Sequence, residues 1–211
     1  LNAIDAGDFS TAQLSNLAVA TLDNLTTTQI AGLNTTQSQS LTVTQLNNLS
    51  TTNLNALDIA ELSTAQIGGV ESTTIDDLTT TQIAGLSTSQ VSSLTAAQIG
   101  VLTTTELQGL ATTQLAALTA TQLGNLTTTV LNDLTAAQVT ALTSTQFYGL
   151  SAAQIDGLST TNLNAVDAGD FSVTQLSNLA VATLDNLTTT QVADLSSTQV
   201  GSLSTTQLDN L

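Results

Sequence analysis

Residues 78–85 read Leu-Thr-Thr-Thr-Gln-Ile-Ala-Gly, and this eight-residue unit recurs with small changes through almost the whole chain of 211 residues. The consensus of these octads is Leu-[Ser/Thr]-x-x-Gln-[Ile/Leu/Val]-x-x, and it occurs 24 times. Position one is apolar in all 24 octads, and position six is apolar in 23, with Ser38 as the exception. Position five is Gln in 17 octads and Glu once, at Glu106. Repetition of this extent indicates an array in which each repeat is one small structural unit.

The octads form three blocks, each preceded by a five-residue step. The blocks are 9–56, 62–165 and 171–210, and the steps are 4–8, 57–61 and 166–170. A longer period lies above the octad, because residues 1–29 match residues 163–191 at 26 of 29 positions, which gives a super-repeat of 162 residues. We therefore interpret residues 1–211 as one continuous repeat array, and we expect the steps to form corners or shortened turns in it.

Each octad predicts one short helix. Ser or Thr at position two and Gln at position five have the spacing of a capping box, and the apolar residues at positions one and six have that of a hydrophobic staple. A glycine at position eight predicts a left-handed residue that ends the helix. Such glycines are Gly85, Gly109, Gly149 and Gly157. One long helix does not fit, because eight residues turn an α-helix by about 800°, roughly 80° beyond two full turns.

A single octad cannot fold alone. Ordering eight residues of backbone costs roughly 8–16 kcal/mol, whereas burying two large aliphatic side chains returns roughly 3–6 kcal/mol. Stacking of neighbours is therefore required, which predicts an all-α solenoid or superhelix of very short helices, with two or three octads per turn. A β-solenoid is the alternative because Thr, Val and Ile favour strands, although an unbroken strand would point positions one and six to opposite faces.

The composition excludes several classes of function. The chain has 16 acidic residues, no Lys, Arg or His, and a net charge of −16. Such a chain repels nucleic acids and anionic membrane surfaces, and it has no apolar run near the roughly 20 residues that span a bilayer. No Cys, His or Lys is present to bind a transition metal or to activate a Ser or Thr nucleophile. We therefore predict no enzyme activity and no catalytic, cofactor-binding or metal-binding residues.

The steps carry pairs of acidic residues three positions apart. These pairs are Asp5/Asp8, Asp58/Glu61 and Asp167/Asp170. They could offer oxygen ligands to calcium, but two carboxylates fall short of the six to eight ligands that calcium takes. The other interpretation is that the first acid is an N-cap and that the second lies in the first turn of a helix.

Two other features are candidates for surface contacts. Five Asn-x-[Ser/Thr] sequons occur, at Asn24, Asn34, Asn48, Asn125 and Asn186. Four of them cross an octad boundary, so we interpret the sequons as a by-product of the repeat. Phe147 and Tyr148 form the only aromatic pair in the sequence, and we expect Phe147 in the core and Tyr148 at the surface.

The tandem Leu-[Ser/Thr]-x-x-Gln-[Ile/Val]-x-x stretches, as in residues 78–126, resemble octapeptide arrays in very large secreted bacterial surface proteins of adhesin or fibre type. The resemblance implies an extracellular or cell-surface, bacterial protein, and it transfers no catalytic or binding residue. We expect a segment of a self-associating filament or biofilm fibre, cut from a longer protein, whose partners are copies of itself. Divalent cations are expected as ions that screen the charge between copies. The alternatives are a passive stalk of a giant adhesin and, less favoured, a glycan- or ice-binding solenoid.

Overall fold

The computed structural model describes residues 4–211, which form 24 α-helices of four to six residues and three 3-10 helices, with no β-strand. The all-α prediction is therefore confirmed, and the β-solenoid alternative is wrong for this part of the chain. The chain divides into two compact units, one ending at Gly109 and the other beginning at Leu110, and each is described by itself.

The helices of the two units follow one another with only short connections. The first unit contains η1 (Ala6–Asp8), α1 (Thr11–Asn16), α2 (Val19–Leu22), α3 (Thr27–Ala31), α4 (Thr35–Ser40), α5 (Val43–Leu46), α6 (Thr51–Ala56), η2 (Ile59–Glu61), α7 (Thr64–Gly69), α8 (Ser72–Asp76), α9 (Thr80–Ala84), α10 (Thr88–Ser93), α11 (Ala96–Gly100) and α12 (Thr104–Gly109). The second unit contains α13 (Thr112–Leu115), α14 (Ala120–Gly124), α15 (Thr128–Asp133), α16 (Ala136–Thr140), α17 (Ser144–Phe147), α18 (Ala152–Asp156), α19 (Thr160–Leu163), η3 (Ala168–Asp170), α20 (Val173–Asn178), α21 (Val181–Asp185), α22 (Thr189–Ala193), α23 (Ser197–Val200) and α24 (Thr205–Leu208). Each octad therefore supplies one α-helix, and each step supplies one 3-10 helix.

The capping box explains where the helices begin. In α9, the Gln82 backbone N–H donates to the Thr79 hydroxyl at 3.2 Å, and the Thr79 backbone N–H donates to Gln82 Oε1 at 3.0 Å. Sixteen of the described helices have both bonds, with Ser, Thr or Asn as the cap and Gln three residues later. The capping-box prediction is confirmed.

The prediction of left-handed glycines at the helix ends is wrong, because no described residue has a positive φ. Gly85 has φ −79° and ψ −9°, and its N–H donates to Thr81 O at 2.9 Å. The next residue, Leu86, donates to Ile83 O at 3.2 Å. The helix thus ends by tightening its last turn in a right-handed conformation that any residue can adopt. Gly109, Gly149 and Gly157 are likewise not left-handed.

One of these glycines is required for a different reason. A Cβ built on Gly149 would lie 2.3 Å from the backbone oxygen of Ala120 in α14, whereas a Cβ on Gly109 would meet no atom within 4 Å. The helices α14 and α17 are therefore too close at this point for any side chain at residue 149.

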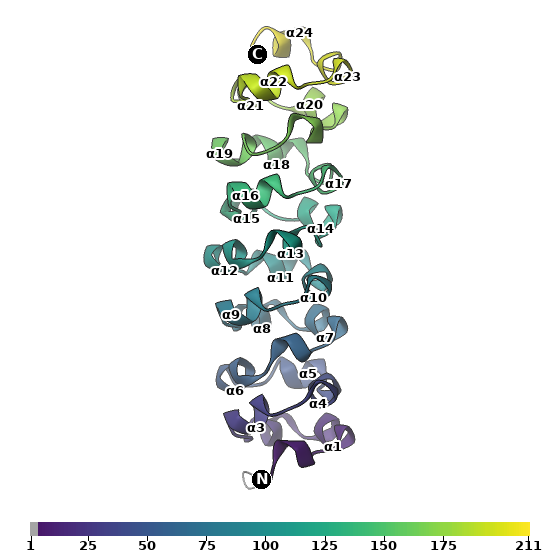
Figure 1. Ribbon diagram of the computed structural model, residues 1–211, viewed down its shortest axis with the longest axis vertical. Coiled ribbons are helices and arrows are strands. Elements are labelled where there is room, and N and C mark those ends of the chain that lie inside the picture. The colour runs from purple at the N-terminus through teal and green to yellow at the C-terminus, as the bar shows by residue number, and fades with distance from the viewer. Residues whose placement is uncertain (1–3) are drawn as a thin grey trace. The chain divides into compact units, whose positions relative to one another are not determined.

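Three repeat segments, where a segment is an octad or a step, complete one turn of each solenoid. In the first unit α1 packs on α4, α2 on α5 and α3 on α6, and in the second α13 packs on α16 and α21 on α24. Figure 1 shows the stacking of α1 with α4 and of α3 with α6. The sequence left two or three octads per turn open, and the structure gives three.

The steps are shortened octads, so the structure has the second of the two forms expected for them, shortened turns and not corners. They take the place of a full octad in the stack, because η2 packs on α4 and η3 packs on α17. The middle residue of each step is buried in the position that an octad gives to its sixth residue; these residues are Ala6, Ile59 and Ala168.

The core of each turn is built from positions one and six. In the octad of residues 41–48, Leu41 is 2% exposed and Leu46 is 1% exposed. The aromatic residues follow the same rule: Phe147 is buried and packs edge-on against Phe171, with the ring centroids 5.3 Å apart and the planes at 88°. The prediction that Phe147 is a core residue is confirmed.

Candidate functional site

The glutamine at position five links each turn of the solenoid to the previous one. Gln45 is 2% exposed, and its Oε1 accepts the Thr42 backbone N–H at 2.8 Å and the Thr42 hydroxyl at 3.1 Å. Its Nε2 donates to the backbone oxygens of Leu14 at 2.8 Å and Leu17 at 2.9 Å. One side chain therefore caps its own helix and bonds two carbonyls of the turn before it.

The same bonds recur in both units and form a ladder. Twelve glutamines donate from Nε2 to a position-one carbonyl three segments earlier and to a position-six carbonyl, or its equivalent in a step, four segments earlier. They are Gln37, Gln45, Gln66, Gln82, Gln90, Gln98, Gln146, Gln154, Gln175, Gln191, Gln199 and Gln207. Buried polar groups must be hydrogen-bonded, so this ladder explains why an amide is used at a largely buried position.

In four octads with Asn or Thr at position five, another turn supplies the acceptor for the backbone N–H of the N-cap residue. In each, the N-cap backbone N–H donates to a side-chain oxygen of an Asp or Asn at position seven, four segments earlier. The pairs are Ser50 with Asp23 at 2.8 Å, Glu71 with Asn47 at 3.0 Å, Ser159 with Asn132 at 2.7 Å and Ala180 with Asp156 at 3.0 Å. We call these four pairs the cross-turn caps.

The position-five residue of the capped octad takes part in the same contact. Asn53 Nδ2 donates to Asp23 O at 2.7 Å, to Asp23 Oδ1 at 3.1 Å and to Leu25 O at 3.2 Å. Thr183 donates from its hydroxyl to Asp156 Oδ1 at 2.6 Å. The side-chain oxygens of Asp23, Asn47 and Asp156 therefore accept from two or more donors of a later octad. Asn132 Oδ1 accepts from the Ser159 N–H alone, and Asn162 Nδ2 donates to backbone oxygens instead.

Sequence reasoning missed the cross-turn caps, although the sequence contains a signal for them. The Asp or Asn lies 27 residues before the N-cap, or 24 residues before it where a step intervenes. Two further octads lack Gln or Glu at position five, those of Thr21 and Val130, and no cross-turn cap is recorded for either among the described residues.

The cross-turn cap of Asp23 lowers the pKa of its carboxyl group. Partial burial raises the pKa of Asp23, but the hydrogen bonds from the Ser50 hydroxyl, the Ser50 backbone N–H and the Asn53 side chain outweigh burial and lower the pKa below its ordinary value of 3.8. Asp23 is therefore held as a carboxylate that accepts hydrogen bonds at neutral pH.

The first acid of each step is an N-cap, as one of the two interpretations predicted. Asp5, Asp58 and Asp167 accept from the backbone N–H two residues later, at 2.9, 3.1 and 2.9 Å. The second acid accepts a hydroxyl from the previous turn in two of the steps: Ser144 donates to Asp170 at 2.5 Å, and Thr35 donates to Glu61. Hydrogen bonds within the fold thus account for five of the six step acids; for Asp8 the structure records no such partner.

No group of three or more Asp and Glu side chains gathers where it could hold a metal ion within residues 4–211. In the same range, no helix is both long enough and apolar enough to cross a membrane. The Asp5/Asp8, Asp58/Glu61 and Asp167/Asp170 pairs lie in separate steps, and the structure does not bring them together in a larger acidic cluster.

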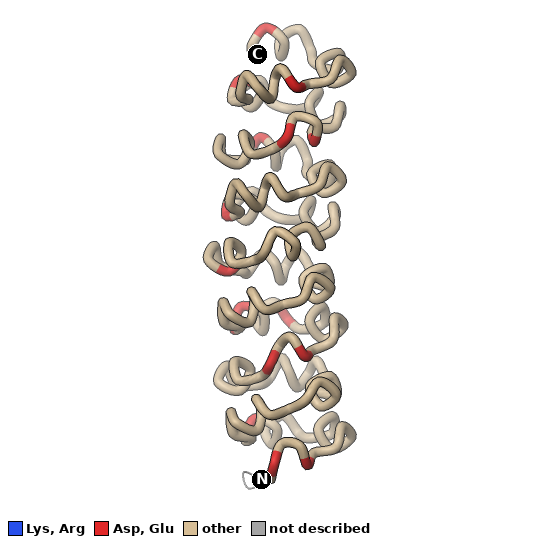
Figure 2. The backbone as a smooth tube through the Cα atoms, viewed as in Figure 1, with Lys and Arg blue, Asp and Glu red and all other residues tan. Residues whose placement is uncertain are grey.

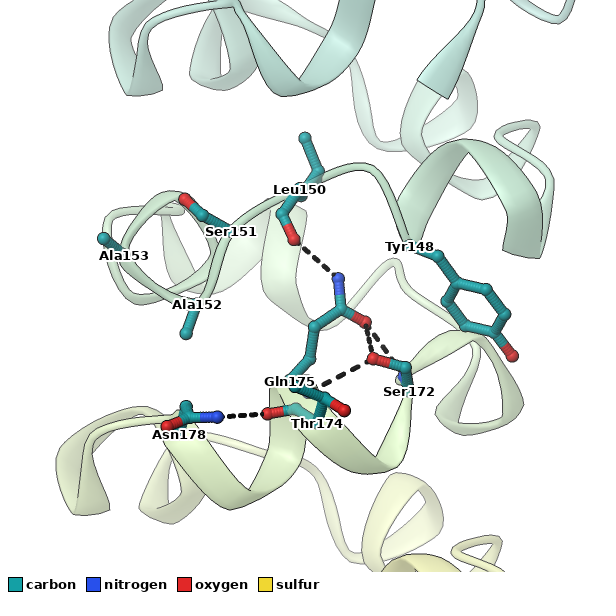
Figure 3. Close-up of a pocket in the computed structure, with 9 residues that line it drawn as sticks. All are labelled: Tyr148, Leu150, Ser151, Ala152, Ala153, Ser172, Thr174, Gln175 and Asn178. Atoms are coloured by element: carbon teal, nitrogen blue, oxygen red, sulfur yellow. Dashed lines mark hydrogen bonds between the residues drawn. The ribbon is translucent and has the colours of Figure 1, made fainter. Parts of the chain in front are cut away.

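An open groove of about 500 Å³ lies beside Tyr148 in the second unit (Figure 3). Its lining includes Ser172, Gln175 and Asn178, together with Leu150 to Ala153 and Thr174. The Gln175 amide is fully used, because Oε1 accepts from Ser172 and Nε2 donates to Phe147 O and Leu150 O. Tyr148 is 49% exposed at the edge of the groove, so the expectation of a surface position is confirmed.

All five sequon asparagines are exposed. In three of them Nδ2 donates to the backbone oxygen four residues earlier in its own helix, at 2.8 Å for Asn48, 2.8 Å for Asn125 and 2.7 Å for Asn186. Asn34 is an N-cap that accepts from Gln37 at 3.0 Å. The repeat therefore gives these four asparagines a structural use of their own.

A comparison with protein-family models finds no match for this chain, and a comparison with curated proteins finds none either.

Proposed function

We propose that the chain is a structural segment of an extracellular, self-associating filament or surface fibre, of the kind its octads resemble, and that it catalyses no reaction. The observation that supports this most strongly is the glutamine ladder. Each turn offers its neighbour the same carbonyl acceptors and receives the same Nε2 donors, as Gln45 and Gln146 do in the two units. An array of this kind extends by repetition, which is the property that a fibre needs.

The exposed side chains favour repeated lateral contacts between copies over a single specific binding site. Positions three and four of many octads expose hydroxyl groups, as Thr51 and Thr52 do in α6 and Thr80 and Thr81 do in α9. These rows repeat with the octad, so any contact that one turn makes with another copy is available to the next turn. Weak contacts that repeat in this way add up along two parallel copies.

The charge sets a condition on this association. Acidic residues are spread over many turns of each unit in Figure 2, with no cationic residue beside them. Two copies at a net charge of −16 repel each other unless salt or divalent ions screen them. We therefore expect lateral association to depend on ionic strength.

Electron cryo-microscopy of the native, unfractionated material is the test of the filament role. Continuous fibres with short helices that step every eight residues are the expected result. Isolated rods that do not associate would overturn self-association and favour a passive stalk that presents a binding domain elsewhere in the protein. The 4.7–4.8 Å spacing of strands in the fibre core would contradict the helical fold as well.

The charge condition has its own measurement. Bundles of the fibre should loosen when the salt concentration is lowered, and a further loosening in EDTA at constant ionic strength would identify divalent ions as the screening species. Light scattering and electron microscopy follow the bundles. Bundles that stay unchanged under both treatments would contradict the dependence on screening while leaving the fibre itself in place.

A further inference from the structure

An array of near-identical octads has a problem of register. Because positions one and six are apolar in nearly all of the 24 octads and position five is Gln in 17, shifting one turn against its neighbour by one octad mostly keeps apolar residues together and Gln beside a carbonyl. Such a shift changes few contacts, so alternative stackings of similar free energy compete with the native one. β-Strands with a uniform pattern slip for the same reason.

We propose that the cross-turn caps fix the register of the turns in each unit. Each cap requires an Asp or Asn at one particular position seven, and that position is not uniform. The residues at position seven of the octads on either side of Asp23 are Ser15 and Ala31. A shift by one octad would therefore replace the acceptor of the Ser50 N–H by a short hydroxyl or a methyl group.

Because the residue at position five is shorter than Gln in these octads, the N-cap N–H depends on an acceptor from another turn. Gln45 reaches its own N-cap amide, so α5 is capped in any register. Asn53 is one methylene shorter, and its Nδ2 instead donates to Asp23 and Leu25. When the stacking is shifted, the Ser50 N–H loses its acceptor and nothing in its own helix replaces it. Because this N–H lies at the surface, water takes the place of Asp23, and the folded state loses the net stabilisation of a charge-assisted hydrogen bond.

Each of the two units contains two cross-turn caps. The caps at Asp23 and Asn47 lie in the first unit, and those at Asn132 and Asp156 lie in the second. In each unit one cap spans 27 residues and the other spans 24 across a step. The caps at Asp23 and Asn132 fix the register in both directions, because no neighbouring octad has an Asp or Asn at position seven. The caps at Asn47 and Asp156 fix it in one direction, because Asn55 and Asn164 lie one octad later. Two of the acceptors are Asn, which shows that the acceptor oxygen is needed and the negative charge is not.

A set of variants at one cap tests the hydrogen-bond pairing. Asp23→Ala should raise the unfolding equilibrium constant about tenfold and speed amide exchange at Ser50 by a similar factor, because the N–H loses its acceptor. Asp23→Asn should keep both near the wild-type values. Adding Asn53→Gln to Asp23→Ala should restore protection at Ser50, because the Gln supplies the local capping box.

Asp76 provides the matched control. It also lies at position seven of its octad, but the N-cap 27 residues later, Thr103, donates its N–H to Glu106 Oε2 of its own helix at 2.8 Å, and the structure records no hydrogen bond to the Asp76 carboxylate within the described residues. Asp76→Ala should therefore leave the unfolding equilibrium within about twofold of wild type, as surface substitutions usually do. Equal effects of Asp23→Ala and Asp76→Ala, or no rescue by Asn53→Gln, would overturn the pairing.

A chain without any cross-turn cap tests the register itself. All four acceptors are replaced by Ala and all four position-five partners by Gln, so that each octad caps its own helix. Because local capping is retained, the equilibrium stability should stay within about tenfold of wild type in the unfolding constant. Refolding from urea should nevertheless give several slowly exchanging species in NMR spectra where the wild type gives one. A single species that refolds at the wild-type rate would overturn the proposal.

Discussion

The neighbouring octads 41–48 and 49–56 use different acceptors for the backbone N–H of the N-cap residue. In the first, the Thr42 N–H donates to Gln45 Oε1 at 2.8 Å within the same helix. In the second, the Ser50 N–H donates at the same distance, 2.8 Å, to Asp23 Oδ1 from the previous turn. The two N–H groups make similar hydrogen bonds. The first bond needs only a partner three positions later in the sequence, whereas the second forms only when two turns are stacked.

This difference separates two requirements of a repeat protein: each helix must form, and the correct turns must stack on one another. A local capping box starts a helix wherever the sequence occurs, and it therefore favours helical octads without choosing their neighbours. A cap that comes from 27 residues away forms only when the correct turns are stacked. The uniform octads supply most of the hydrogen bonds, and the octads that depart from the consensus supply the information about which turn follows which.

Removing the amide of a uniform octad should have the largest effect. Gln45→Ala deletes four hydrogen bonds at a buried position and leaves the Thr42 N–H and the Leu14 and Leu17 oxygens with fewer partners. We expect the free energy of unfolding to fall by about 3 kcal/mol or more. Urea unfolding followed by far-ultraviolet circular dichroism measures the loss.

The control is Thr42→Ala in the same octad. The Thr42 hydroxyl caps α5 by accepting the Gln45 backbone N–H at 3.1 Å, and its removal leaves the Nε2 bonds of Gln45 to Leu14 and Leu17 in place. Its replacement should cost about 1 kcal/mol, the usual value of a helix cap. Equal losses at Thr42 and Gln45 would mean that the Nε2 bonds between turns contribute nothing to stability.

Sequence reasoning found half of what Gln45 does. The spacing of Thr42 and Gln45 is a local pattern, and it predicted the capping box. The bonds from Nε2 to Leu14 and Leu17 depend on how many segments complete a turn, which the octad pattern does not determine because it is the same for two segments and for three. The role of Asp23 was hidden for the same reason. The local prediction that failed, left-handed glycines, assumed that Gly85 was needed for its conformation.

A buried polar residue that departs from the consensus and has no hydrogen-bond partner should lower the stability of the fold. Ser38 replaces the apolar residue of position six in octad 33–40; it is fully buried, and its hydroxyl has no hydrogen-bond partner. Ser38→Ala should therefore raise the free energy of unfolding by about 1 kcal/mol. Ser40→Ala is the control, because the Ser40 hydroxyl donates to Gln37 O at 2.7 Å, and its removal should not stabilise the protein. A loss of stability at Ser38 would show that its hydroxyl has a partner in solution.

The smallest effect distinguishes the charge of a cross-turn cap from its geometry. The hydrogen bonds from Ser50 and Asn53 lower the pKa of Asp23 below 3.8 in the folded protein, so the folded state binds the proton less readily than the unfolded state. The stability that this contributes is present above pH 3.8 and is lost as the pH falls through the folded-state pKa.

Asn at residue 23 keeps the acceptor oxygen but does not titrate, as Asn132 shows in its own cap. The wild type should therefore lose up to about 1 kcal/mol more than Asp23→Asn on going from pH 6 to pH 2.5, since Asp23 is partly exposed to solvent. Urea unfolding at each pH measures this difference, in which the contributions of the other acidic residues cancel. Parallel curves for the two proteins would mean that the cap at Ser50 does not distinguish a carboxylate from an amide at any pH.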